Sequence, residues 1–221
     1  MPVDYTVKQG DYLAAIAHQF GFADPDILWN DPANAALKQQ RINPNVLYPG
    51  DTVVIPDLQT QELPRSTGAR HSFVLNAKPL WLRIRLAQAF AKTLAKTPCE
   101  FTVGSTTSTL NANASAQLSS PCPPTVKSAR VVAHTTVRLG KNAIPVDIQF
   151  DAKVGYLDPI DTPTGQLGRL SNLGYYLNFD PDNQVADLKS AIEEFQCDNH
   201  LSVDGICGPA TQAKLKAIHG C

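Results

Sequence analysis

The sequence has no long apolar run and no excess of charge of either sign. None of its hydrophobic stretches approaches the roughly 20 residues that a membrane-spanning helix needs, so we expect no membrane insertion. Its 221 residues include 19 Lys and Arg against 20 Asp and Glu, and this balance gives no field that attracts nucleic acid. The first residues lack the basic and apolar regions of a secretory signal, so we expect synthesis in the cytoplasm without a signal peptide.

Motifs for catalysis and metal binding are also missing. The five histidines form no His-x-x-x-His or His-x-His pair, which argues against a zinc hydrolase site. There is no Gly-x-Ser-x-Gly elbow and no Ser-x-x-Lys motif. Cys197 stands near His200 and Cys221 near His219, but nothing marks the oxyanion site that a thiol nucleophile needs. We predict no enzyme, no metal site and no cofactor.

Two polar, proline-containing segments divide the chain. The first follows Pro56 and has no hydrophobic period, which is typical of a linker. The second, a cluster of Pro, Asp and Thr around residues 157–163, separates a strand-like region from a helix-like one. The sequence predicts an N-terminal module, a linker, a middle domain and a C-terminal module, at residues 1–57, 58–69, 70–158 and 159–221.

The N-terminal module has the pattern β-α-α-β. Tyr5 and Val7 alternate with polar residues in a short strand, and Asp11 is expected to cap the helix that follows. A second helical stretch covers residues 27–37, and residues 52–55 read as a closing strand. The apolar stripe of the first helix has the spacing i, i+3, i+4, i+7 and consists of Leu13, Ile16, Ala17 and Phe20.

This pattern carries a family motif. Its two halves are Tyr5-x-Val7-x-x-Gly10-Asp11-x-Leu13-x-x-Ile16-Ala17-x-x-Phe20-Gly21 and Pro49-Gly50-Asp51-x-Val53-x-Ile55-Pro56. Over about fifty residues the N-terminal module closely resembles the LysM domain. The resemblance implies binding of glycans that contain N-acetylglucosamine, usually peptidoglycan or chitin.

The resemblance also places a glycan-binding groove between two loops. One loop follows the first strand, and the other precedes the last strand. The implied groove residues are Gly10, Asp11, Tyr12, Leu13, Asn45, Val46, Leu47 and Tyr48. Loop amides would hold N-acetyl carbonyls, and Tyr12 or Tyr48 would stack on a sugar face. The sequence departs from the family at Tyr12, where a small hydroxyl residue is common, and in a longer segment from Asp31 to Arg41.

The middle domain is predicted to be a small β-sandwich. Strand-like patterns cover residues 71–75, 80–86, 99–103, 126–139 and 145–150. Arg83 and Arg85 alternate with apolar residues and are expected on a solvated strand face. The Ser, Thr, Asn and Ala stretch from Gly104 to Ser120 is expected to be mostly loop.

The C-terminal module is predicted to contain three helices. One carries a stripe that includes Leu188, Ile192 and Phe195, and another opens at Gly208-Pro209. The motif Phe195-Gln196 followed by Asp204-Gly205-x-x-Gly208-x-x-Thr211 resembles the three-helix peptidoglycan-binding domain of cell-wall hydrolases. The resemblance implies a second wall-binding module at these six residues, while Asp204, Gly205 and Gly208 also fit turn and cap positions.

The five cysteines have no Cys-x-x-Cys spacing, which argues against zinc binding and thioredoxin-like redox chemistry. Cys99 and Cys122 flank the polar loop of the middle domain, where a disulfide would join its two ends. In the C-terminal module one pair among Cys197, Cys207 and Cys221 would form, and the sequence does not choose between them.

Together these parts predict a multidomain α+β protein with a βααβ LysM module, a central β-sandwich and a three-helix peptidoglycan-binding-like module. This order resembles LysM and peptidoglycan-binding proteins encoded beside spike and effector genes of bacterial type VI secretion systems. The resemblance implies a non-catalytic accessory protein that binds peptidoglycan and has a secretion spike protein or an effector as its partner. It also implies delivery from the bacterial cytoplasm to the periplasm or outside by the contractile system.

Two other functions stay open. The first is an adaptor for the spike or effector whose modules contact proteins without binding glycan. The second is an injected toxin that targets the cell wall.

Overall fold

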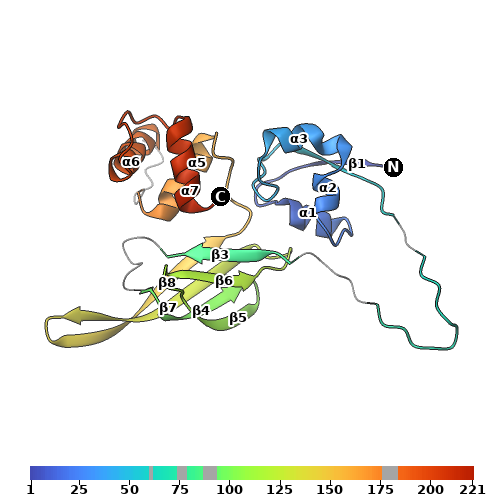
Figure 1. Ribbon diagram of the computed structural model, residues 1–221, viewed down its shortest axis with the longest axis horizontal. Coiled ribbons are helices and arrows are strands. Elements are labelled where there is room, and N and C mark those ends of the chain that lie inside the picture. Colours follow the sequence, from blue (N-terminus) through green and yellow to red (C-terminus); the bar gives the residue numbers. More distant parts are fainter. Residues whose placement is uncertain (60–61, 74–78, 87–93, 176–183) are drawn as a thin grey trace.

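The computed structural model describes the chain except residues 60–61, 74–78, 87–93 and 176–183. Figure 1 shows a small N-terminal module, a strand-rich middle region and a C-terminal helical module. The two outer modules lie next to each other on the same side of the middle region (Figure 1). None of the helices in the described part of the chain is long and apolar enough to cross a membrane.

The N-terminal module pairs its first and last strands around short helices. Strands β1 and β2 are antiparallel, with Val3 opposite Ile55 and Tyr5 opposite Val53. The elements are β1 Val3–Thr6, α1 Leu13–Gln19, α2 Asp26–Trp29, the 3₁₀ helix η1 Pro32–Asn34, α3 Ala35–Gln40 and β2 Thr52–Ile55. The apolar stripe of α1 enters the core, which also contains Leu28, Trp29 and Val53. The predicted order of strands and helices is confirmed.

The second predicted helical stretch is divided into α2, η1 and α3. Pro32 has no N–H for a helix interior, and the Asp31 side chain accepts a hydrogen bond from the Ala33 N–H at 2.9 Å, which starts a new turn. The buried Asn34 amide then donates to the carbonyls of Leu28 and Val54 and accepts from the Val54 N–H. One side chain thus joins α2 to β2.

The middle region is built from six described strands in two sheets. These are β3 Trp81–Arg85, β4 Pro98–Val103, β5 Thr106–Asn111, β6 Gln117–Pro121, β7 Ser128–Leu139 and β8 Asn142–Lys153. Strands β3 and β6 form one antiparallel pair, and the other sheet has the order β5-β4-β7-β8. One hydrophobic core serves both sheets and includes Leu86, Phe101, Leu118 and Val131. The strand-rich character is as predicted, but the sheets are small and the sandwich stays a prediction. Residues 71–73 of the strand predicted at 71–75 are not in a strand, and residues 74–75 lie outside the described residues.

The expectation of a loop between Gly104 and Ser120 is wrong. Strand β5 pairs with β4, and β6 pairs with β3. The alternation that forms β6 is visible in the structure, where Leu118 and Ser120 are buried and their neighbours are not. The sequence pattern did not predict β6 because most of its residues are polar. The strand forms by pairing with β3, and Leu118 packs into the core.

The C-terminal module contains the helices α5 Pro163–Leu173, α6 Gln184–Asp198 and α7 Pro209–His219. They share a core that includes Leu170, Ile192, Phe195 and Leu215. Helix α5 begins with a side-chain cap, because the Thr162 hydroxyl accepts the Gly165 N–H at 3.0 Å. A Cβ atom on Gly165 would lie 1.9 Å from the carbonyl oxygen of Pro159, so this close approach requires glycine.

Arg169 on α5 holds the ends of the C-terminal module together. Its side chain is 2% exposed. Its Nε donates to the carbonyl oxygen of Cys221 at 2.8 Å, and its Nη1 donates to those of Asp158 and Gly165 at 2.8 and 2.7 Å. The buried guanidinium is therefore solvated by backbone carbonyls instead of water.

Candidate functional site

The first groove loop is shaped by the Asp11 carboxylate. This group accepts hydrogen bonds from the Tyr5 hydroxyl at 2.8 Å and from the Lys8 N–H at 2.9 Å. The prediction that Asp11 caps α1 is wrong, because the N-cap position is Tyr12, whose side chain makes no capping hydrogen bond. Asp11 instead ties the loop back to β1, and Gly10 takes the positive φ of +87° that the turn requires.

The second groove loop is held by a buried ion pair that the motif did not single out. Arg41 contacts Asp51 through two hydrogen bonds of 2.8 and 2.9 Å, and both side chains are less than a tenth exposed. The hydrogen bond to Asp51 is the main reason that the pKa of Arg41 is raised. Asp51 also accepts the Tyr48 N–H at 2.9 Å. The two loops meet where the Leu13 N–H donates to the Pro44 carbonyl at 3.3 Å.

The structure brings the eight predicted groove residues together, but few of them face solvent. Tyr12 is 3% exposed and Leu13 is 1% exposed. Gly10, Val46 and Leu47 are also buried, and Asp11 is partly buried. Asn45 is exposed, and Tyr48 is 36% exposed with the Arg41 guanidinium 5.7 Å from its ring centroid. The accessible part of the groove therefore consists of Asn45 and Tyr48 in the second loop.

The first loop packs against the middle region. The Tyr12 hydroxyl lies 2.8 Å from the carbonyl oxygen of Pro124 and 3.0 Å from that of Val126. Burial raises the pKa of Tyr12 to about 12. The Lys127 ammonium donates to the Gly10 carbonyl at 2.8 Å. Tyr12 therefore serves as an interdomain contact in this arrangement, in place of the sugar-stacking surface that the resemblance implies.

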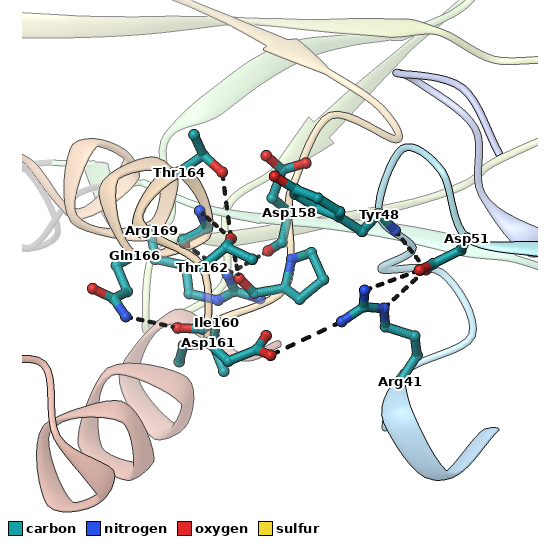
Figure 2. A network of polar contacts seen from close by, with 12 residues as sticks. Arg41, Tyr48, Asp51, Asp158, Ile160, Asp161, Thr162, Thr164, Gln166 and Arg169 are labelled. Atoms are coloured by element: carbon teal, nitrogen blue, oxygen red, sulfur yellow. Dashed lines mark hydrogen bonds and ion pairs between the residues drawn. The ribbon is translucent and has the colours of Figure 1, made fainter. Parts of the chain in front are cut away.

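The second loop lies beside the connection to the C-terminal module. Figure 2 shows Arg41 between Asp51 and Asp161, and the distance from Nη1 of Arg41 to Oδ2 of Asp161 is 3.9 Å. The same turn leads into α5, where Thr162 and Arg169 make the contacts described above (Figure 2). This weak ion pair joins the two outer modules at the edge of the predicted groove.

The predicted wall-binding residues of the C-terminal module organise one loop. Gln196 is 1% exposed, and its Oε1 accepts the N–H groups of Asp204 and Gly205, each at 3.0 Å. Its Nε2 lies within hydrogen-bonding distance of Asp204, Ile206 and Thr211 oxygens. Phe195 belongs to the core, and Gly208 precedes α7. Gln196 and its partners Asp204, Gly205 and Thr211 thus fix the shape of a loop that presents Ile206, 66% exposed, to solvent.

The cysteines are all free thiols in the structure, so the predicted disulfides are not formed in it. Cys99 and Cys122 are buried in the middle core, where burial raises the pKa of both thiols. Cys207 is buried in the C-terminal core, and Cys197 is exposed.

Cys221 and His219 are in contact, as their sequence positions allow. The Cys221 Sγ lies 3.2 Å from Nδ1 of His219, whose Nε2 lies 3.0 Å from the Asn172 side-chain amide. Burial raises the pKa of the Cys221 thiol, and burial together with Arg169 lowers the pKa of His219 to about 4. Both shifts favour the neutral thiol and the neutral imidazole over the thiolate–imidazolium pair that nucleophilic catalysis uses.

A depression of about 490 Å³ lies on the four-stranded sheet, and none of the predicted groove residues lines it. Its charged lining includes Arg130 and Asp151, which pair with each other at 2.6 Å. Among the described residues, no group of three His, Cys, Asp or Glu side chains is arranged to hold a metal ion.

Comparisons with known families agree with both motif assignments. Residues 5–56 match the family model of the LysM domain. Residues 167–215 match a family model described as "Putative peptidoglycan binding domain". A LysM domain and a peptidoglycan-binding domain are therefore present, one at each end of the chain. No curated protein and no solved structure matches the chain.

Proposed function

We propose that this chain is a non-catalytic peptidoglycan-binding protein that acts as an accessory to a type VI secretion spike or its effector. The observation that carries the wall-binding part is the presence of two domains of wall-binding families on one chain. Their position on the same side of the middle region allows both to meet one wall surface (Figure 1). Two weak contacts on one chain raise the avidity for a polymer that repeats its units.

Sedimentation with purified sacculi tests this function. The wild-type chain is expected to sediment with the sacculi, and Tyr48→Ala is expected to sediment less because it removes an exposed ring of the second groove loop. Ile42→Ala is the matched control, since Ile42 belongs to the same module and is 79% exposed but lies outside the groove residues. A wild-type chain that stays in the supernatant would contradict wall binding.

The non-catalytic part of the proposal is supported by the Cys221 and His219 pair. Its pKa shifts hold both groups in their neutral forms near pH 7. Sacculi incubated with the protein should therefore release no soluble muropeptides. Their release would support an enzymatic activity on the wall instead.

The secretion role is the finer part of the proposal. Its support is the order of the modules, in which a LysM domain, a strand-rich middle region with two small sheets and a peptidoglycan-binding domain follow one another. We propose synthesis in the bacterial cytoplasm and delivery by the contractile apparatus. Co-purification with a spike protein or effector encoded nearby tests the partner, and export that continues in a sheath-deficient strain would argue against the route.

An adaptor function is the second candidate, and the burial of Tyr12 favours it. A LysM loop that already binds a protein surface in its own chain is suited to protein contacts. A chain that binds the spike or effector but not sacculi would support the adaptor over the wall-binding protein.

A further inference from the structure

The middle region covers the first loop of the LysM groove. We infer that this contact closes the groove, so that glycan and the middle region compete for the loop Gly10–Leu13 and the chain must open before the whole groove binds. The inference rests on the proposed function, because it takes the LysM groove as the glycan site. It adds that the closed chain offers a glycan only Asn45 and Tyr48 of the second loop.

The first contact involves the side chain of Tyr12, one of the predicted groove residues. The Tyr12 hydroxyl has one hydrogen to donate, and two carbonyl oxygens, those of Pro124 and Val126, lie within 3.0 Å of it. The ring is covered as well, since Tyr12 is 3% exposed. A sugar that stacked on this ring would have to displace the segment that contains both carbonyls.

The second contact occupies a backbone group of the same loop. The Lys127 ammonium donates to the Gly10 carbonyl at 2.8 Å, lies 3.8 Å from the Asp11 carboxylate and is 5.8 Å from the Tyr12 ring centroid. A glycan hydroxyl or amide therefore meets a Gly10 carbonyl that is already paired. Lys127 belongs to the middle region, so it can be changed without altering the groove itself.

The third contact leaves no room for a ligand. A Cβ atom on Gly155 would lie 2.6 Å from the Gly10 carbonyl oxygen and 2.8 Å from Cδ1 of Tyr12. From the other side, a Cβ atom on Gly10 would lie 3.0 Å from the ring of Tyr156. Ordinary contact distances are about 3.5–4.0 Å on each side of a group, so no pyranose ring fits between these backbones.

The contact is nevertheless able to open. It is polar at its edge, where the Lys127 side chain is 55% exposed, and contacts of this kind between domains of one chain are commonly reversible. The ion pair from Arg41 to Asp161 is the neighbouring link, and Asp161 is 66% exposed. The opposite loop keeps Asn45 and Tyr48 accessible, so a glycan chain can make its first contact there before the groove opens.

The test weakens the contact between LysM and the middle region by substitutions in the middle region alone. Gly155→Val adds a branched side chain against the Gly10 carbonyl, and Gly68→Val is its matched control. Both glycines have positive φ, +83° and +80°, but Gly68 has nothing within 4 Å of its Cβ position. Lys127→Ala removes the paired ammonium by a milder change and carries the test if Gly155→Val does not fold.

Binding of the N-acetylglucosamine hexamer and of sacculi is measured for the full chain of each protein. If the closed form is favoured tenfold, Gly155→Val binds the hexamer about tenfold more tightly than wild type, Lys127→Ala gains less, and Gly68→Val gains nothing. By reciprocity, saturating hexamer should expand the wild-type chain in small-angle X-ray scattering.

The outcomes separate the two proposals. If the wild type and Gly155→Val bind hexamer equally and both sediment with sacculi, the closure is overturned and wall binding stands. If the hexamer binds the wild type without expanding it, the closure is overturned as well. If no variant binds either probe, both proposals fall together.

Discussion

The hydroxyl of Tyr12 lies 2.8 Å from the carbonyl oxygen of Pro124, a residue 112 positions further along the chain. The contact joins the first LysM loop to the segment that follows β6. It buries the ring of Tyr12, one of the residues of the expected groove, so this part of the groove does not face solvent.

Tyr12 should titrate far above an ordinary tyrosine. Burial raises its pKa to about 12, against 10 for an exposed phenol. The neutral hydroxyl is the form that donates to Pro124, so its contribution to the contact is complete below pH 10 and is lost as the pH rises from 10 to 12. The difference in absorbance at 295 nm between wild type and Tyr12→Phe isolates this group. A midpoint near pH 10 would mean that the hydroxyl is in water.

Two glycines on α5 should respond oppositely to the same substitution. Gly165→Ala puts a methyl group 1.9 Å from the Pro159 carbonyl and should destabilise the C-terminal module by more than about 2 kcal/mol. Gly168→Ala meets its nearest atom, Cδ1 of Leu157, at 3.4 Å, and should be neutral or stabilising by up to about 1 kcal/mol. Chemical denaturation of the full chains measures both. Equal effects would show that the approach to Pro159 is not tight.

Acid should destabilise the C-terminal module through His219. Its pKa is lowered to about 4, so the unfolded chain takes up a proton at a higher pH than the folded one. The stability is complete above about pH 6.5 and falls as the pH drops towards 4, by at most about 3 kcal/mol. Thermal unfolding of wild type and His219→Gln between pH 7 and 4 checks this. A variant that loses stability as steeply as wild type would place the effect elsewhere.

Gln196 should matter more to stability than its neutral side chain suggests. Gln196→Leu leaves the partly buried N–H groups of Asp204 and Gly205 without their side-chain acceptor, and we expect a loss of about 2 kcal/mol. Gln212→Ala is the control, since Gln212 donates one side-chain hydrogen bond, to the Cys207 carbonyl, and its loss should cost about 1 kcal/mol. Both are measured by denaturation, with sacculus sedimentation of the folded proteins as a second readout. Sedimentation of Gln196→Leu at the wild-type level would show that the shape of this loop is not needed for wall binding.

The pattern of the sequence was sufficient for the two outer modules. The stripe of α1 and the pairing of β1 with β2 follow from periodicity and turn residues. The motif also identified Gln196 and Asp204, but it did not predict the hydrogen bond between them, which depends on the shape of the loop. The helix stripes are predictable because periodicity is a local property, and the family motifs supply the pairing of β1 with β2, which lie about fifty residues apart.

Other features depend on contacts that no local pattern contains. Asp11 has the residue type and place of a helix cap, but the Tyr5 hydroxyl and the Lys8 N–H bind its carboxylate instead. The partners of Tyr12 lie in another domain, and the pairing of Arg41 with Asp51 spans a loop. Strand β6 is polar on its exposed side and is recognised only with its partner β3 in place. In each case a tertiary contact overrides the local preference.

The covalent connection between LysM and the middle region helps to keep the groove closed. LysM and the middle region are joined by the chain between Ile55 and Trp81, in which residues 62–70 are exposed. Because the two parts belong to one chain, each meets the other at an effective concentration that can approach the order of millimolar, so a contact too weak to join separate proteins persists within one chain. One proteolytic cut at Arg65 or Arg70 would turn the closure into an equilibrium between two molecules. Dilution alone would then uncover the groove.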